Sequence, residues 1–368
     1  MDARASASAE PAPALPLTVP YVRGFSTDPP EASIVSGCCG DAWYMPLPDL
    51  PRRSATDLIL SRDASAHGLT SALRTATNSG TLVRIRRGAY LDATALAELG
   101  NTERYQATVF AAMASRKQPI ATGMSAAALL DLPIVGNWPS EVFLLSHTYS
   151  SRKRRGVVEV ARQGNENVIE HDGCLVTDIP DTLIQVSRTA RFVTALSMVD
   201  AALHVGRFDR RPPMTTLDEL WARHDSRLPY AGSTRVRRVL DMATTQAEST
   251  LETVSRVVID ELGFPEPQLQ YPLYLPISRR EIFMDFGWPE YLVDGEADGR
   301  GKYFGSEADP VTDASVKVMQ EKRRDNEVRG QKWTPAHWDW GDAWHPSLLR
   351  KILLEAGLPI VRRARRRL

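Results

Sequence analysis

The chain has 368 residues, and its hydrophobic content of 43% excludes a disordered protein and is enough for two or three cores. The 45 basic and 45 acidic residues cancel, so any affinity for nucleic acid has to come from local charge. The longest apolar stretches, such as residues 126–135, are too short to span a bilayer, and the first residues lack the order of a signal peptide. We therefore expect a cytoplasmic protein with no membrane partner.

The first hundred residues divide into three segments. Residues 1–20 are rich in Ala, Ser and Pro and are expected to form a disordered tail, because they cannot bury enough apolar surface to offset the entropy of ordering. Residues 21–51 contain many prolines and are expected to be extended. Residues 52–100 are predicted to form a winged helix-turn-helix, with two helical runs and a strand-turn segment at 55–62, 69–78 and 82–90.

This first module is basic. Between residues 52 and 90 there are seven arginines against two aspartates, a local charge of about +5 in a neutral chain. In a winged helix the second helix lies in the major groove and the wing reaches phosphates. The candidate DNA-binding residues are therefore Arg74, Arg84, Arg86 and Arg87. The alternative is that these arginines only keep a small domain soluble.

The middle of the chain, residues 101–230, is predicted to be an α+β module. Helical periodicity occurs around 104–116, 125–130, 180–187 and 192–204. Apolar runs bounded by turn residues indicate strands at 141–145, 157–160 and 174–176. A basic run at 152–155 could add affinity for DNA or could be a solvated loop.

The third predicted module spans residues 235–358 and has an α-β-β-β-α order of elements. One long helix is expected at 235–262, interrupted if at all near Thr244 and ended by Gly263. Strands are expected at 268–275, 281–286 and 291–298, and helices at 311–330 and 346–356. Residues 359–368 read as a basic tail.

Acidic residues gather in the strands of this module. Asp285 ends one predicted strand, while Glu296 and Asp298 are two apart on the next and share a face. Three carboxylates on one surface repel one another unless a cation lies between them, and such oxygen-rich sites suit Mg²⁺. Glu248 and Glu252, placed one turn apart on the long helix, could supply a further metal ligand. The alternative is that each acid is an ordinary solvated residue.

A Mg²⁺ ion held here could activate water and neutralise charge on a phosphodiester. Lys302 follows after the turn at 299–301 and could position the water or the phosphate. The sequence therefore predicts a Mg²⁺-dependent DNA endonuclease site with Asp285, Glu296, Asp298, Lys302 and Glu252 as catalytic candidates, and with Asp285, Glu296 and Glu248 as metal ligands.

The segments 247–252, 284–290, 296–303 and 321–325, taken in order, resemble the C-terminal module of actinobacterial proteins related to very-short-patch-repair endonucleases, a branch of the PD-(D/E)xK fold. The resemblance implies that residues 235–358 form a restriction-endonuclease-like α/β domain. The resemblance implies that Asp285 and Glu296 bind the metal and that Glu252 or Glu248 is the helix acid. It places Asp298 where many of these enzymes have lysine. It also implies that Arg324 and Asp325 close the domain through polar contacts near the site.

The segments 80–90, 122–133 and 176–183 are similar to AbiEi-like antitoxins of type IV toxin-antitoxin systems. That resemblance implies a transcriptional repressor that counters a nucleotidyltransferase-like toxin. Two functions of different classes therefore remain open. The chain either cuts DNA with its C-terminal domain, or it represses transcription and uses that domain only as a scaffold.

Overall fold

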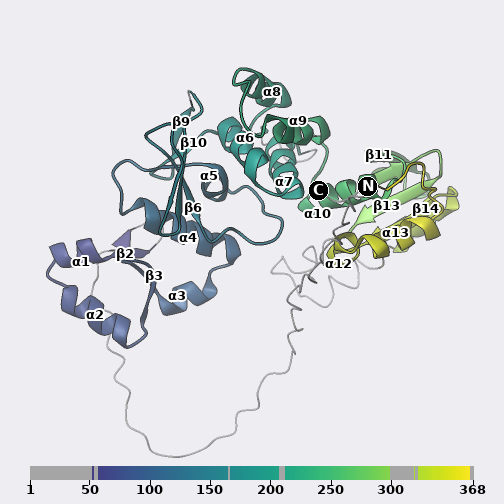
Figure 1. Cartoon of the computed structure of the whole chain (residues 1–368). Helices are drawn as coiled ribbons and strands as arrows, with labels where there is room; N and C mark the ends of the chain where they lie inside the picture. Colours follow the sequence, from purple (N-terminus) through teal and green to yellow (C-terminus); the bar gives the residue numbers. More distant parts are fainter. Residues whose placement is uncertain are drawn as a thin grey trace, which may run out of the picture. The chain divides into compact units, whose positions relative to one another are not determined.

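The computed structural model describes residues 52–53, 57–164, 166–206, 212–298, 319 and 322–364. All of them fall within the larger of two compact units, residues 47–368. They form helices and three β-sheets, and each sheet is built from its own stretch of the sequence (Figure 1). The predicted α+β multidomain class is confirmed. The predictions for residues 1–51 and for Lys302 concern residues outside the described ranges.

The first sheet is antiparallel, with strand order β1-β2-β4-β3. Its strands are β1 (Arg52–Arg53), β2 (Leu58–Leu60), β3 (Leu82–Arg86) and β4 (Ala89–Asp92), and the helices α1 (Ser61–Ala66) and α2 (Thr70–Asn78) lie between β2 and β3 in sequence. The prediction of a helix at 55–62 is wrong for residues 58–60, because three consecutive buried apolar side chains fill a strand between β1 and β4. The winged-helix assignment stays a prediction.

The second sheet is mixed, with strand order β7-β8-β6-β5-β10-β9. Its strands are β5 (Ile120–Ala121), β6 (Val142–Leu145), β7 (Arg152–Arg154), β8 (Val157–Val160), β9 (Val168–His171) and β10 (Cys174–Thr177). Seven helices precede or follow these strands: α3 (Ala93–Glu98), α4 (Asn101–Met113), α5 (Gly123–Leu129), α6 (Ile179–Thr189), α7 (Phe192–Leu203), α8 (Leu217–Asp225) and α9 (Ser233–Met242).

Helix α7 illustrates why the periodic segments were predictable. Leu196, Val199 and Leu203 recur at helical spacing, and all three are buried in the largest apolar cluster of the described residues. Side chains of α4 to α9 contribute to this cluster, whereas α3 packs against the first sheet (Figure 1).

The third sheet has strand order β11-β12-β13-β14, with β13 and β14 parallel and the other pairs antiparallel. Its strands are β11 (Gln268–Leu275), β12 (Arg280–Trp288), β13 (Val293–Ala297) and β14 (Thr334–Trp338). The helices are α10 (Thr250–Leu262), α12 (Trp340–Trp344), α13 (Pro346–Glu355) and the helical residues 322–330. Side chains of α10 and α13 pack with Phe286, Trp288 and Trp338 in one core, while Val328 of the helical residues 322–330 packs with Met284 in another.

Two expectations for this module are corrected. The helix predicted at 235–262 is two helices, α9 and α10, and the break at residues 243–249 includes Thr244, where the sequence had allowed an interruption. Ser249 caps the second helix. Glu248 therefore precedes α10 and does not share a helix face with Glu252. The strand β14 and the helix α12 had not been predicted.

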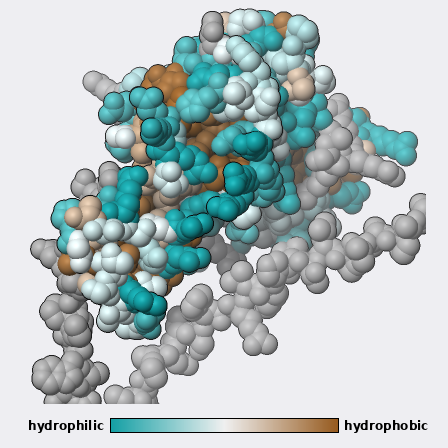
Figure 2. All heavy atoms as spheres, turned by 60° about the vertical axis from the view of Figure 1, so that its left-hand side comes forward, coloured by the Kyte–Doolittle hydropathy of each residue, from teal (hydrophilic) through white to brown (hydrophobic). Residues whose placement is uncertain are grey.

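Figure 2 shows that hydrophilic and intermediate residues cover most of the visible face, with hydrophobic residues in small separate patches. None of the helices in the described ranges combines the length and the apolar character that crossing a bilayer requires.

Candidate active site

Asp285 is fixed at the point where strands β12 and β13 part. The pairing of these strands ends at Phe286 and Gly295, and beyond it the Asp285 Oδ2 atom accepts a hydrogen bond from the Ala297 backbone N–H at 2.9 Å. The Asp285 Oδ1 atom lies 3.5 Å from Nε2 of Gln270 on β11. The Asp285 carboxylate thus accepts a backbone hydrogen bond from β13 in place of a backbone carbonyl, and this bond holds it against that strand.

Glu252 reaches the same place from α10. Its Oε2 atom accepts from the Glu248 backbone N–H at 2.9 Å, and its Oε1 atom accepts from the Ser249 hydroxyl at 2.7 Å. The Ser249 Oγ atom in turn accepts from the Glu252 N–H at 3.2 Å, so the two residues form a reciprocal cap. Glu252 is 5% exposed, and burial, followed by the charge of Asp285, raises its pKa to about 7.

Glu296 is the third acid of this group. Burial raises the pKa of Glu296 well above its ordinary value, and the second cause is the charge of Asp285. Its Oε1 atom pairs with Nη2 of Arg324, which belongs to the helical residues 322–330. Glu252, Asp285 and Glu296 therefore converge from a helix and two strands. We call them the acid site.

Asp298 and His337 form a second polar pair beside Glu296. Asp298 follows β13, and its Oδ2 atom lies 2.9 Å from Nδ1 of His337 on β14, the residue in register with Glu296. The Nε2 atom of His337 lies 3.3 Å from Oδ2 of Asp325. The hydrogen bond to Asp298 raises the pKa of His337, whereas burial opposes the rise.

Sequence reasoning had assigned no role to any histidine and had missed His337. The signal was weak, because Ala336 and Trp338 alternate with it as in a half-buried strand, but Pro335 argues against a strand.

The remaining predicted residues are placed differently. Glu248 is exposed, and it contributes to the acid site through its backbone N–H, which donates to the Glu252 carboxylate. Arg324, which the resemblance placed near the site, contacts Glu296.

The acid site suits a hard divalent cation in its donor chemistry, because it consists of carboxylate oxygens. In the described ranges, however, no group of three or more His, Cys, Asp or Glu side chains is arranged to hold a metal ion. The hydrogen bonds explain this. The carboxylate of Glu252 caps α10, that of Asp285 binds Ala297, and that of Glu296 faces a guanidinium. Arg324 is thus the cation that pairs with Glu296.

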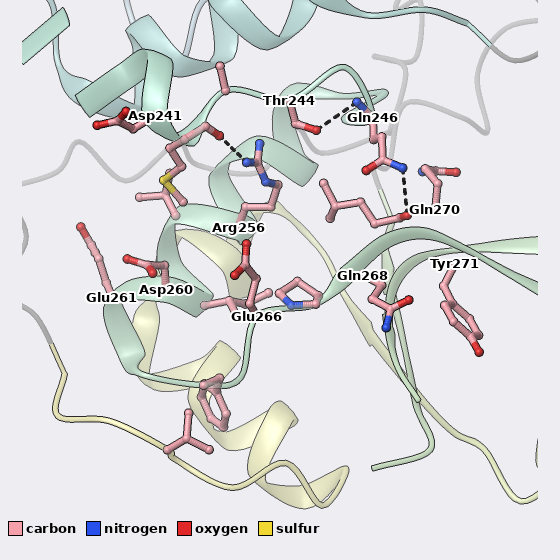
Figure 3. Close-up of a pocket in the computed structure, with 18 of the residues that line it drawn as sticks. Asp241, Thr244, Gln246, Arg256, Asp260, Glu261, Glu266, Gln268, Gln270 and Tyr271 are labelled. Atoms are coloured by element: carbon pink, nitrogen blue, oxygen red, sulfur yellow. Dashed lines mark hydrogen bonds between the residues drawn. The ribbon is translucent and has the colours of Figure 1, made fainter. Parts of the chain in front are cut away.

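A groove of about 1060 Å³ borders the acid site along α10 and β11 (Figure 3). Gln270 connects the two, since it lines the groove and faces Asp285. Three arginines line the groove. Arg256 pairs with Asp200, Arg362 pairs with Asp260, and Arg238 lies over the Phe192 ring. Four acids also line it, namely Asp241, Asp260, Glu261 and Glu266, so the groove has no excess of positive charge to attract nucleic acid.

The predicted DNA-binding arginines divide into two kinds. Arg74, Arg84 and Arg87 are exposed and have no ion-pair partner in the described part of the chain. Arg86 is half-buried and donates from Nη2 to the backbone carbonyl of Arg155, in the β7–β8 turn, at 2.8 Å. Burial, and then the charge of Arg116, lowers the pKa of Arg86. Arg86 therefore connects two segments of the fold.

The fold defines an α+β protein with a buried acid site in its third sheet. No family model matches the chain. Two curated proteins of Mycobacterium tuberculosis, from strain CDC 1551 / Oshkosh and from strain ATCC 25618 / H37Rv, share 32% identity with it over 125 residues. The matched stretch covers 34% of this chain and 43% of each relative, and both relatives are named as uncharacterized proteins. This similarity does not indicate a function. The resemblances to very-short-patch-repair endonucleases and to AbiEi-like antitoxins therefore stay predictions.

Proposed function

We propose that this chain is a cytoplasmic DNA-binding protein with a Mg²⁺-dependent, endonuclease-like phosphodiesterase site at Glu252, Asp285 and Glu296. The observation that carries the proposal is the convergence of these three acids from α10, β12 and β13. The charge of Asp285 raises the pKa of both other carboxyls, so the three groups interact electrostatically. A site of mutually repelling, buried carboxylates favours a divalent cation.

The chain's own residues supply the positioning. When bound, Mg²⁺ would help activate water and neutralise the phosphodiester. Asp285 is directed by the Ala297 N–H, and Glu252 is directed by its cap with Ser249. Gln270 supports Asp285 from β11. Lys302 is proposed to orient the phosphate.

DNA is proposed to reach the protein through the first module. Arg74, on the exposed side of α2, and Arg84 and Arg87, on and after β3, present charges that phosphates can pair with. These contacts position the duplex without reading its sequence.

Cleavage tests this proposal. The full chain should nick supercoiled plasmid or a mismatched duplex with Mg²⁺, and EDTA should stop the reaction. Asp285→Asn should lower the rate at least a hundredfold, because it removes a carboxylate that the metal requires. Glu290→Gln is the matched control, since Glu290 is an exposed acid of the same module. A wild type as inert as Asp285→Asn on all substrates would remove the catalytic proposal.

A second candidate function is a transcriptional repressor or antitoxin whose nuclease-like domain does not cut. Its specific support is Arg324, which neutralises Glu296 without a metal. In that case the partners would be operator DNA and a nucleotidyltransferase-like toxin. Binding to the DNA upstream of its own gene, together with an adjacent nucleotidyltransferase gene and no cleavage, would favour this function over the first.

A further inference from the structure

Two hairpin tips of the same sequence meet between the first and the second sheet. The two-residue loop of the β3–β4 hairpin is Arg87-Gly88, and that of the β7–β8 hairpin is Arg155-Gly156. Arg86 joins them, because its Nη2 atom donates to the Arg155 carbonyl at 2.8 Å. The two Arg-Gly loops therefore lie next to each other, although 69 positions separate Arg86 from Arg155.

The backbone of both tips is held in place. The Gly88 carbonyl accepts from the Ser61 N–H, at the start of α1, at 2.9 Å. Arg155 has a φ of +50° and Gly156 a φ of +71°, which is the pattern of a type I′ turn. Asn and Gly are the residues that such turns favour, and a left-handed arginine is uncommon. The turn itself does not explain the arginine, so its side chain is expected to have a role.

The cations around this contact are not neutralised by acids. Arg87, Arg154 and Arg155 are exposed, and none of them forms an ion pair within the described ranges. Burial, and then the charge of Arg116, lowers the pKa of Arg86, so a further exposed cation lies close to the contact. A dense group of unpaired positive charges attracts a polyanion.

We propose that the two Arg-Gly tips form one phosphate-binding surface for duplex DNA, which we call the tip surface and which consists of Arg87, Arg154 and Arg155. This inference rests on the proposed DNA-binding function and extends it from the first module to the second sheet. Arg86 positions the tips and does not itself pair with a phosphate, since its guanidinium is bonded to a carbonyl. Neither loop contains an aromatic side chain on which an unpaired base could stack, which favours a duplex over a single strand.

Two substitutions test the tip surface without disturbing the turns. Arg155→Asn removes the charge, suits the left-handed turn and keeps the carbonyl that Arg86 binds. Arg87→Gln removes the charge of the other tip. Each should weaken binding of the full chain to a random-sequence DNA duplex about tenfold and reduce the slope of log affinity against log salt by about 1, and the double variant should reduce the slope by about 2.

Fluorescence polarisation across a salt series measures these effects, and calorimetric melting establishes that each variant is folded. Arg279→Asn is the matched control. Arg279 is also an exposed arginine in a hairpin loop, between β11 and β12, and its φ is +52°. The control should bind DNA like the wild type, because it lies outside the tip surface.

The outcomes separate this inference from the proposed function. A wild type that does not bind duplex DNA would overturn the proposed DNA binding and the inference with it. Binding that Arg84→Ala weakens but Arg155→Asn leaves unchanged would overturn the inference alone. An equal loss in Arg279→Asn, or a loss in Arg155→Asn without a change in the salt slope, would also overturn it. Tighter binding to single-stranded DNA or to duplex RNA would contradict duplex DNA as the partner of the tip surface.

Discussion

Gly295 shows how tightly a single residue can constrain the third sheet. A Cβ atom at this position would lie 2.7 Å from Cη2 of Trp338, 2.8 Å from Cζ3 of Trp288 and 3.0 Å from Cβ of Phe286. These are core side chains that cannot move away freely. Glycine at 295 allows the two indole rings to approach β13 between the two acids Asp294 and Glu296.

Gly295→Ala should therefore destabilise the protein. Overpacking of a filled core costs about 1 to 3 kcal/mol of unfolding free energy, which urea denaturation would measure. Gly330→Ala is the control, because nothing lies within 4 Å of its Cβ position. A loss at Gly295 no larger than at Gly330 would contradict the packing argument.

Asp200 carries a pH-dependent part of the stability. It is 1% exposed, accepts hydrogen bonds from the Thr244 N–H and the Thr253 hydroxyl, and pairs with Arg256 at 2.8 Å. Burial raises the pKa of Asp200 to about 6, although Arg256 acts in the opposite direction. The folded protein thus binds this proton more tightly than the unfolded chain, whose carboxyl has a pKa of about 4.

The sign of the pH dependence follows. The stabilisation from Asp200 protonation is complete below about pH 4 and is lost as the pH rises through about 6, by roughly 2 to 3 kcal/mol. Asp200→Asn should flatten the wild-type decrease in unfolding free energy over this range. Asp241→Asn, which changes an exposed acid, should leave the decrease unchanged. Equal slopes in Asp200→Asn and wild type would contradict the assignment.

At the residue level the sequence predicted part of the acid site. Asp285 and Glu296 were expected to meet because adjacent strands joined by a short turn pair antiparallel, and the structure brings them together. The contact between Arg324 and Glu296 joins residues 28 positions apart, and it was implied only by resemblance. The burial of Asp294 beside Arg324 and the pairing of His337 had no local signal, because both depend on how the helical residues 322–330 and β14 pack.

At the level of elements, the periodic segments were predicted well, whereas the break between α9 and α10 was foreseen only as an alternative near Thr244. The residues of α7, β8 and β11 follow clear helix or strand patterns. The junction between α9 and α10 lies between two segments of helical periodicity, so the pattern alone suggests one helix. The break depends on the Ser249 cap and on the bond from the Thr244 N–H to Asp200, which is 44 residues away.

Removal of the Ser249 cap should weaken the start of α10. Ser249→Ala leaves the Glu252 N–H without its acceptor and should cost about 1 kcal/mol of unfolding free energy. Ser233→Ala is the control. Ser233 is in the first turn of α9, and the N-cap of that helix, Gly232, makes no side-chain capping hydrogen bond. Guanidinium denaturation of both variants gives the comparison. Identical losses would indicate that the cap adds nothing specific.

For the molecule as a whole, the first two sheets are connected by a basic residue that the sequence had assigned to DNA. Arg86 bonds to Arg155 in the β7–β8 turn, and a Cβ atom on Gly156 would lie 3.7 Å from its guanidinium nitrogens. Its neighbour Arg84 is exposed and has no such bond among the described residues. Two arginines of one strand therefore have different expected roles.

Arg84→Ala and Arg86→Ala should consequently separate DNA binding from stability. If Arg84 pairs with a phosphate, its loss should weaken binding to a random duplex about tenfold and reduce the slope of log affinity against log salt by about 1. The melting temperature should not change. Arg86→Ala should lower the melting temperature by a few degrees, because a partly buried hydrogen bond is worth about 1 kcal/mol. Fluorescence polarisation across a salt series and calorimetric melting measure the two effects. If Arg84→Ala binds DNA like the wild type, β3 is not part of the proposed interface. If only Arg86→Ala loses binding, the contact between the two sheets is needed to hold the DNA-binding surface in place.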